Sequence, residues 1–140
     1  MIAVRVAESA ADRMAAVHRC ADVLEEIGAV QPGYRAAMVA RERSISTYMG
    51  EGVAIPHGVG VSRLLVRQDA LAVLRFPGGV DWGGYRVIVC VAIAARGDGH
   101  IELLAALAEI LLDPPRAAAL RSAEDPDQIV RMFCPLGECR

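Results

Sequence analysis

Residues Tyr85 to Ala94 are rich in valine and isoleucine with almost no polar interruption, and this run restricts the folds open to the chain. A strand with one solvent-exposed face alternates apolar and polar residues, whereas a strand covered on both faces is apolar almost throughout. The run therefore predicts a central strand with other elements packed on each side. With 140 residues, the chain has the size of one domain and can bury one continuous core.

The other elements follow from apolar spacing and from turn residues. Strands are expected over residues 2–6, 53–55 and 71–76, with turns at 77–79 and 81–84. Helical spacing predicts helices over 10–27, 32–43, 100–112, 115–121 and 126–133, with Ser9 as the cap of the first. Glycine and hydroxyl residues over 44–60 predict a loop that contains the short strand.

The alternation of these strands and helices indicates the fold class. It predicts an α/β fold, a single-domain sandwich in which a small mixed, mostly parallel β-sheet carries helices on both faces. We expect one domain over residues 1–140, with its core at about 1–133 and a tail at 134–140.

Charge and hydropathy argue against two kinds of partner. All 15 basic residues are arginine, they are scattered, and the net charge is -2, so no basic stripe indicates nucleic-acid binding. The longest wholly apolar run, Val87 to Ala95, is far shorter than a bilayer span, and the apolar start lacks the features of a signal peptide. We therefore expect a cytoplasmic protein without direct membrane insertion.

The four cysteines do not indicate a metal centre. Cys20 and Cys90 have aliphatic neighbours and are expected to be small core residues. Cys134 and Cys139 could form a disulfide or half of a metal site, but no further Cys or His lies near them in the sequence. A tail is the simpler reading, and no cofactor or metal ion is expected.

His57 has the most distinctive surroundings of the three histidines. It follows the short strand and lies between Pro56 and Gly58 in a glycine-rich loop. Pro56 limits the freedom of the backbone, and Gly58 permits close approach by another molecule. The segment therefore predicts an imidazole that is presented to a partner.

The other two histidines have different surroundings. His100 falls in the first turn of a predicted helix, where the helix dipole favours a neutral imidazole and the amides attract anions such as phosphate. If the fold brings it to His57, one histidine could carry a phosphoryl group while the other donates to its oxygens. Alternatively, His100 is merely the residue at the start of a helix and takes no part in phosphate chemistry. His18 lies within the first helix, where a surface or partly buried imidazole is expected.

Arginine suits phosphate because its planar guanidinium offers paired donors and stays charged. Arg41, Arg43 and Arg96 lie nearest in sequence to the two histidine segments, although each of them, taken singly, is better read as a solvated surface charge. The pair Arg41-Glu42 is distinguished by its position just before the glycine-rich segment.

The segment from Arg41 to Gly58, RERSISTYMGEGVAIPHG, closely resembles the active-site signature of phosphotransferase-system (PTS) enzyme IIA domains of the mannitol/fructose class. Similar residues occur in that class at positions 34 and 38, over 76–83, over 93–100 and at 103–104. The resemblance spans residues 1 to 133, and a match of this length around a histidine is much more specific than a lone short motif.

The resemblance implies a phosphocarrier of sugar uptake. The histidine matching His57 takes a phosphoryl group on Nε2 from the phosphohistidine of the carrier HPr and passes it to a cysteine of a IIB domain, which serves the membrane component IIC. His100 matches a second active-site histidine, Arg41 a phosphate-stabilising arginine, and Glu42 an accompanying residue with an orienting role. The sequence contains no IIB or IIC segment, so these partners are expected on other chains.

Two other functions remain open. A regulatory protein of the nitrogen-related enzyme IIA type would use the same histidine to control binding to other proteins. The segment Ser46 to Gly50 resembles the mannitol type more closely and favours sugar transport. A binding protein that has lost phosphoryl transfer is disfavoured, because both histidines and the arginine are present.

Overall fold

The computed structural model describes residues 1–97 and 99–133, without the side chain of residue 100. The described strands form one five-stranded sheet in the order β1-β4-β5-β3-β2. The strands are β1 (Ile2–Arg5), β2 (Tyr48–Gly50), β3 (Val53–Ala54), β4 (Ala70–Trp82) and β5 (Tyr85–Ala94). The helices are α1 (Arg13–Glu26), α2 (Tyr34–Ser44), α3 (Gly99–Leu111), α4 (Pro114–Ser122), α5 (Pro126–Phe133) and the 3₁₀ helix η1 (Gly60–Leu65).

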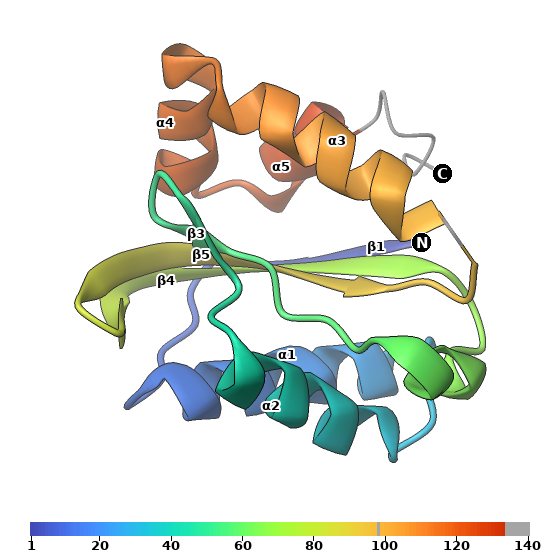
Figure 1. Cartoon of the computed structure of the whole chain (residues 1–140). Helices are drawn as coiled ribbons and strands as arrows, with labels where there is room; N and C mark the ends of the chain where they lie inside the picture. The colour runs from blue at the N-terminus through green and yellow to red at the C-terminus, as the bar shows by residue number, and fades with distance from the viewer. Residues whose placement is uncertain (98, 134–140) are drawn as a thin grey trace.

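Strand β5 lies in the middle of the sheet and is covered on both faces, as its apolar run predicts. Helices α1 and α2 cover one face, and α3, α4 and α5 cover the other (Figure 1). Alternate β5 residues enter different cores: Cys90 and Ala92 pack with α1 and α2, whereas Val89 and Val91 pack with the C-terminal helices. This confirms the predicted α/β sandwich with helices on both faces.

The sheet is mixed as expected, but the expectation that it is mostly parallel is wrong. β1–β4 and β3–β5 are parallel pairs, whereas β2–β3 and β4–β5 are antiparallel. The longest ladder, β4–β5, is antiparallel because a tight turn joins its strands. Gly83 and Gly84 have φ values of 66° and 98° and supply the left-handed backbone that such a turn requires.

Several local predictions need correction. Pro77–Gly79 is not a turn between strands, because β4 continues through it with a register shift between Arg75 and Val80. The first helix is capped by Asp12 rather than Ser9, since the Asp12 carboxylate accepts the Ala15 amide hydrogen at 2.8 Å. The loop expected over 44–60 contains the additional strand β2, and η1 follows it.

The two internal cysteines are core residues, as expected. Both are buried, and burial raises the pKa of the Cys90 thiol well above its usual range, which keeps it protonated. Cys134 and Cys139 lie outside the described residues. No helix within the described ranges is long and apolar enough to cross a membrane.

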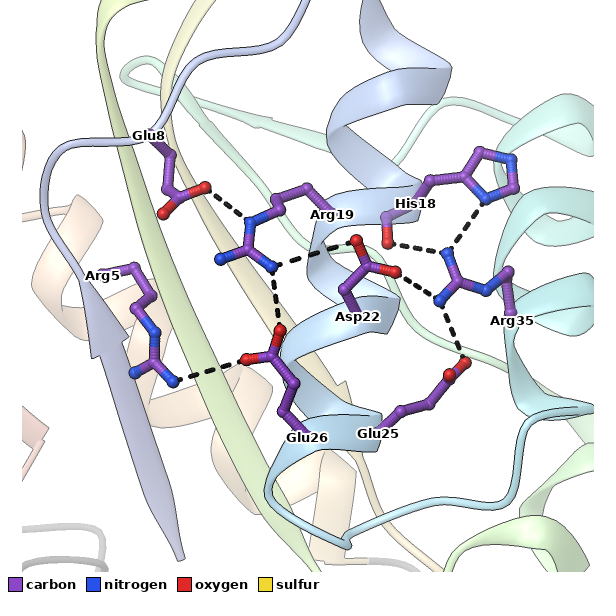
Figure 2. Close-up of polar contacts among 8 residues, drawn as sticks. All are labelled: Arg5, Glu8, His18, Arg19, Asp22, Glu25, Glu26 and Arg35. Atoms are coloured by element: carbon purple, nitrogen blue, oxygen red, sulfur yellow. Dashed lines mark hydrogen bonds and ion pairs between the residues drawn. The ribbon is translucent and has the colours of Figure 1, made fainter.

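Charged side chains join α1 to α2 (Figure 2). Arg35 of α2 pairs with Asp22 and, at 3.1 Å, with Glu25 of α1, and it donates to the His18 carbonyl oxygen at 2.9 Å. His18 is exposed on α1 beside this guanidinium, which confirms the predicted surface position. Because α2 carries Tyr34, Arg41 and Glu42, these contacts help to fix the helix that supports the candidate site.

Candidate functional site

The backbone of His57 is held at the carboxyl end of β5. Strand β3 pairs in parallel with β5, and the pairing resumes with an isolated bridge between His57 and Ile93. The Ile93 amide donates to the Pro56 carbonyl oxygen at 3.0 Å. His57 is partly exposed, while its neighbours Pro56 and Gly58 are buried. The imidazole therefore stands on a fixed backbone at the surface of the molecule.

The imidazole of His57 is oriented by a hydrogen bond from within its own segment. Its Nδ1 lies 2.7 Å from the carbonyl oxygen of Ile55. A carbonyl oxygen can only accept, so Nδ1 must carry the proton in this contact. In the neutral ring the lone pair is then on Nε2. This tautomer leaves Nε2 with the lone pair that a nucleophilic nitrogen requires.

A buried tyrosine occupies the space beside Gly58. The Gly58 amide donates to the Tyr34 hydroxyl at 2.8 Å, and this hydroxyl donates to the Ile93 carbonyl oxygen at 3.0 Å. A Cβ on Gly58 would lie 2.6 Å from a ring carbon of Tyr34 and 2.7 Å from Oγ of Ser62. The expectation that Gly58 admits another molecule is therefore wrong, because the group that approaches it belongs to this chain.

Tyr34 stays protonated in this position. Burial raises the pKa of its phenol, and this outweighs the opposing effects of the Gly58 amide and the Arg63 charge. The neutral phenol can donate one hydrogen bond and accept another, and it does both here.

The close contact at Gly58 leads to a stability prediction. Gly58→Ala is expected to lower the free energy of unfolding by about 1–3 kcal/mol, because the new methyl group overlaps the Tyr34 ring and cannot be accommodated without a shift. Gly78→Ala is the matched control, since a Cβ there has no neighbour within 4 Å. Urea denaturation of both variants checks this, and equal stability of the two would contradict it.

Glu42 is a buried carboxylate that joins three parts of the structure. It is only 2% exposed. It accepts hydrogen bonds from the Thr47 hydroxyl, from the Thr47 amide at 3.2 Å and from Nε1 of Trp82 at 3.0 Å. Helix α2, the loop before β2 and the end of β4 thus meet at one side chain. The Glu42 carboxylate therefore holds these three segments together.

Arg41 bonds to the same loop from the adjacent position on α2. Its guanidinium is partly exposed and donates to the carbonyl oxygen of Ile45, four residues on. Arg41 and Glu42 therefore both hold the loop that leads to β2. Of the other candidates, Arg43 lines a hollow between α1 and α2 with His18, and the Arg96 amide donates to the Asp69 carboxylate at 3.0 Å.

Helix α3 begins at the same end of β5 as His57. Strand β5 ends at Ala94, next to the bridge partner of His57, and α3 starts at Gly99. Arg63 of η1 donates to the Gly97 carbonyl oxygen at 3.2 Å, so the segment after His57 contacts the segment entering α3. The His100 side chain lies outside the described residues, and its contact with His57 stays a prediction.

From the sequence, Tyr34, Thr47 and Trp82 received no role in this region, although all three lie in the stretches that resemble the enzyme IIA class. Trp82 is the single tryptophan of the chain, and a buried indole N–H needs an acceptor. From that requirement, a hydrogen bond between Trp82 and the carboxylate of an acidic residue elsewhere in the chain could have been expected. No comparable signal in the sequence pairs Tyr34 with Gly58. Within the described residues, no group of His, Cys, Asp and Glu side chains could hold a metal ion.

Comparison with known proteins gives one consistent family. The family model described as "Phosphoenolpyruvate-dependent sugar phosphotransferase system, EIIA 2" matches residues 2–134. A multiphosphoryl transfer protein of Xanthomonas campestris pv. campestris is 44% identical over 128 residues, which cover 91% of this chain and 15% of that protein. The mannitol-specific phosphotransferase enzyme IIA component of Staphylococcus aureus is 35% identical over 118 residues, covering 84% of this chain and 82% of that protein.

A solved structure supports the same fold. Enzyme IIA of the mannitol system of Escherichia coli, in its complex with phosphorylated enzyme IIB, has a TM-score of 0.87 and 26% identity over 94% of each chain. The multiphosphoryl transfer proteins that the chain matches are much longer, and the chain spans between 15% and 33% of their length.

Proposed function

Because the chain belongs to the EIIA 2 family of the phosphoenolpyruvate-dependent sugar phosphotransferase system, we propose that it is a phosphocarrier whose phosphoryl group resides on Nε2 of His57. The observation that carries this proposal is the contact of His57 Nδ1 with the Ile55 carbonyl oxygen. It leaves the lone pair of the neutral ring on Nε2. A partly exposed neutral imidazole with a fixed tautomer is suited to nucleophilic attack on phosphorus.

Transfer takes place in two displacement steps. First, the Nε2 lone pair attacks the phosphorus of the donor's phosphohistidine. The new N–P bond forms as the donor's N–P bond breaks, and the electron pair of the broken bond leaves with the donor imidazole. Next, a cysteine thiolate of the acceptor attacks the same phosphorus, and the electron pair of the N–P bond returns to Nε2. The Ile55 carbonyl oxygen holds the Nδ1 proton throughout, so the ring keeps its orientation in both steps.

Three further residues assist in this proposal. Arg41 stabilises the charge of the phosphoryl group, His100 donates a hydrogen bond to its oxygens, and Glu42 orients the segment. The orienting role of Glu42 is supported by the hydrogen bond that it accepts from Thr47, and Arg41 lies beside the same loop, where it donates to Ile45. The start of α3 at the His57 end of β5 supports the role of His100.

His100→Ala is expected to leave the fold intact and to slow phosphoryl transfer about tenfold, the effect of losing one hydrogen bond to a charged group. Rapid-quench measurement of labelling rates checks this. A wild-type rate in the variant would return His100 to the role of a helix-start residue.

We propose HPr as the donor and a IIB domain as the acceptor, working in the cytoplasm with a membrane component IIC in mannitol- or fructose-type uptake. The E. coli neighbour forms a complex with phosphorylated IIB, which supports this choice of acceptor. In a regulatory role of the nitrogen-related enzyme IIA type, the same histidine would be used and its phosphorylation state would control binding to other proteins.

One experiment tests this function. The chain is incubated with phosphoenolpyruvate, enzyme I and HPr, and candidate IIB domains are then added. Labelling of His57 followed by transfer to a IIB cysteine is expected. Stable labelling without transfer to any IIB domain would favour the regulatory role, and absence of labelling would overturn the proposal.

A further inference from the structure

We propose that Tyr34 is a positioning residue for His57, an inference that rests on the proposed role of His57 as phosphoryl acceptor. The Tyr34 hydroxyl fixes the peptide between His57 and Gly58 against the end of β5, and the orientation of the imidazole depends on that peptide. Tyr34 acts through the backbone and does not contact the phosphoryl group.

The pairing of His57 with Ile93 shows what Tyr34 replaces. In a parallel ladder, each bridge is made of two slanted hydrogen bonds on either side of one residue. Here the Ile93 amide donates to Pro56, which is the first of the two. The second would join the Gly58 amide to the Ile93 carbonyl oxygen. The Tyr34 hydroxyl lies between these two groups, accepting from Gly58 at 2.8 Å and donating to Ile93 at 3.0 Å.

This arrangement lets the chain leave the sheet without an unpaired buried group. Gly58 is buried, and its amide would lack an acceptor if the strand diverged with no substitute. The Tyr34 hydroxyl links the Gly58 amide to the Ile93 carbonyl oxygen although these two groups lie farther apart than in a direct hydrogen bond. It therefore marks the point at which the chain diverges from β5. His57 lies between the two hydrogen-bonding positions of this bridge, and with the backbone on this course its Nδ1 lies 2.7 Å from the Ile55 carbonyl oxygen.

The position of Tyr34 is itself well fixed. It is the first residue of α2 and is 1% exposed, and the ring packs against the space left by the absent side chain of Gly58. A buried phenol with two hydrogen bonds has little freedom to move. The fixed position of the Tyr34 hydroxyl therefore fixes the peptide between His57 and Gly58.

Tyr34→Phe is the test, because it removes the hydroxyl and keeps the ring. Phosphorylated HPr serves as the donor in single-turnover labelling, and nitrogen NMR reports the tautomer of His57. The variant is expected to label roughly 10- to 100-fold more slowly at saturating donor, with the half-saturating donor concentration unchanged. The His57 ring is expected to change from the Nδ1-protonated form to a mixture of tautomers.

Tyr48→Phe is the matched control. The Tyr48 hydroxyl also accepts a glycine amide, that of Gly52 at 3.2 Å, but in the turn between β2 and β3. This control is expected to keep the wild-type rate and tautomer. A Tyr34→Phe protein with the rate and tautomer of the wild type would overturn the inference, as would an equal loss in both variants.

Two measurements on the wild-type protein keep the inference testable even if Tyr34→Phe does not fold. The Gly58 amide is expected to be protected from hydrogen exchange to the same degree as the amides of β5, and rapid exchange would overturn the role of Tyr34. Failure of phosphorylated HPr to label the wild type would count against the proposed function alone, because tautomer and exchange are measured without a donor.

Discussion

His57→Gln abolishes labelling by phosphorylated HPr: this is the largest effect we expect from any single substitution in the chain. The amide of glutamine is not a nucleophile, so no N–P bond can form, whereas its size and polarity approximate those of the imidazole. The fold is expected to persist, because His57 is partly exposed and the backbone bonds at Pro56 and Gly58 do not involve its ring. Incubation with enzyme I, HPr and labelled phosphoenolpyruvate, followed by gel analysis, measures the result.

The chemistry of the label and a second histidine variant make this test specific. A phosphohistidine is labile in acid and stable in alkali, so the wild-type label should show this pattern. His18→Gln is the control, since His18 is exposed on α1 beside Arg35 and should be dispensable for labelling. Robust labelling of the His57→Gln protein would refute the assignment of the acceptor.

The central strand and its layers could be predicted because they depend on local pattern. The apolar run from Tyr85 to Ala94 matches β5 from end to end, and helix α5 has the predicted bounds of 126 to 133. The course of the chain from 77 to 79 was mispredicted, because proline and glycine indicate a turn. Their effect inside β4 is a register shift, which only the pairing with β5 reveals.

Only part of the candidate site could be predicted. His57 was identifiable because proline, histidine and glycine are adjacent in the sequence, and Glu42 because it lies in the signature segment. Position 34 resembles the enzyme IIA class, but the role of Tyr34 was not identifiable, because its bonds to Gly58 and Ile93 cross 24 and 59 residues. Contacts of this length are determined by how α2 packs on the sheet, and hydrophobic periodicity does not contain that information.

Glu42→Ala is expected to cause the largest loss of stability, about 3 kcal/mol of the free energy of unfolding. Without the carboxylate, the indole N–H of Trp82 and the amide and hydroxyl of Thr47 lose their acceptor, and each buried unpaired group costs about 1–3 kcal/mol. Release of a buried charge offsets part of that cost. Urea unfolding should show a lower midpoint with an unchanged slope. Trp82 is the single tryptophan, so its fluorescence reports directly on this site.

Two further variants separate the geometry of Glu42 from its charge. Glu42→Gln is expected to lose only about 1 kcal/mol, since its amide oxygen can accept from Trp82 and the Thr47 amide while its NH₂ group donates to the Thr47 hydroxyl. Glu109→Ala, at an exposed position on α3, should change stability by less than about 0.5 kcal/mol. If Glu42→Gln were as unstable as Glu42→Ala, the negative charge and not the shape of the acceptor would stabilise the loop. A Glu42→Ala protein as stable as Glu109→Ala would show that Trp82 and Thr47 do not need this carboxylate.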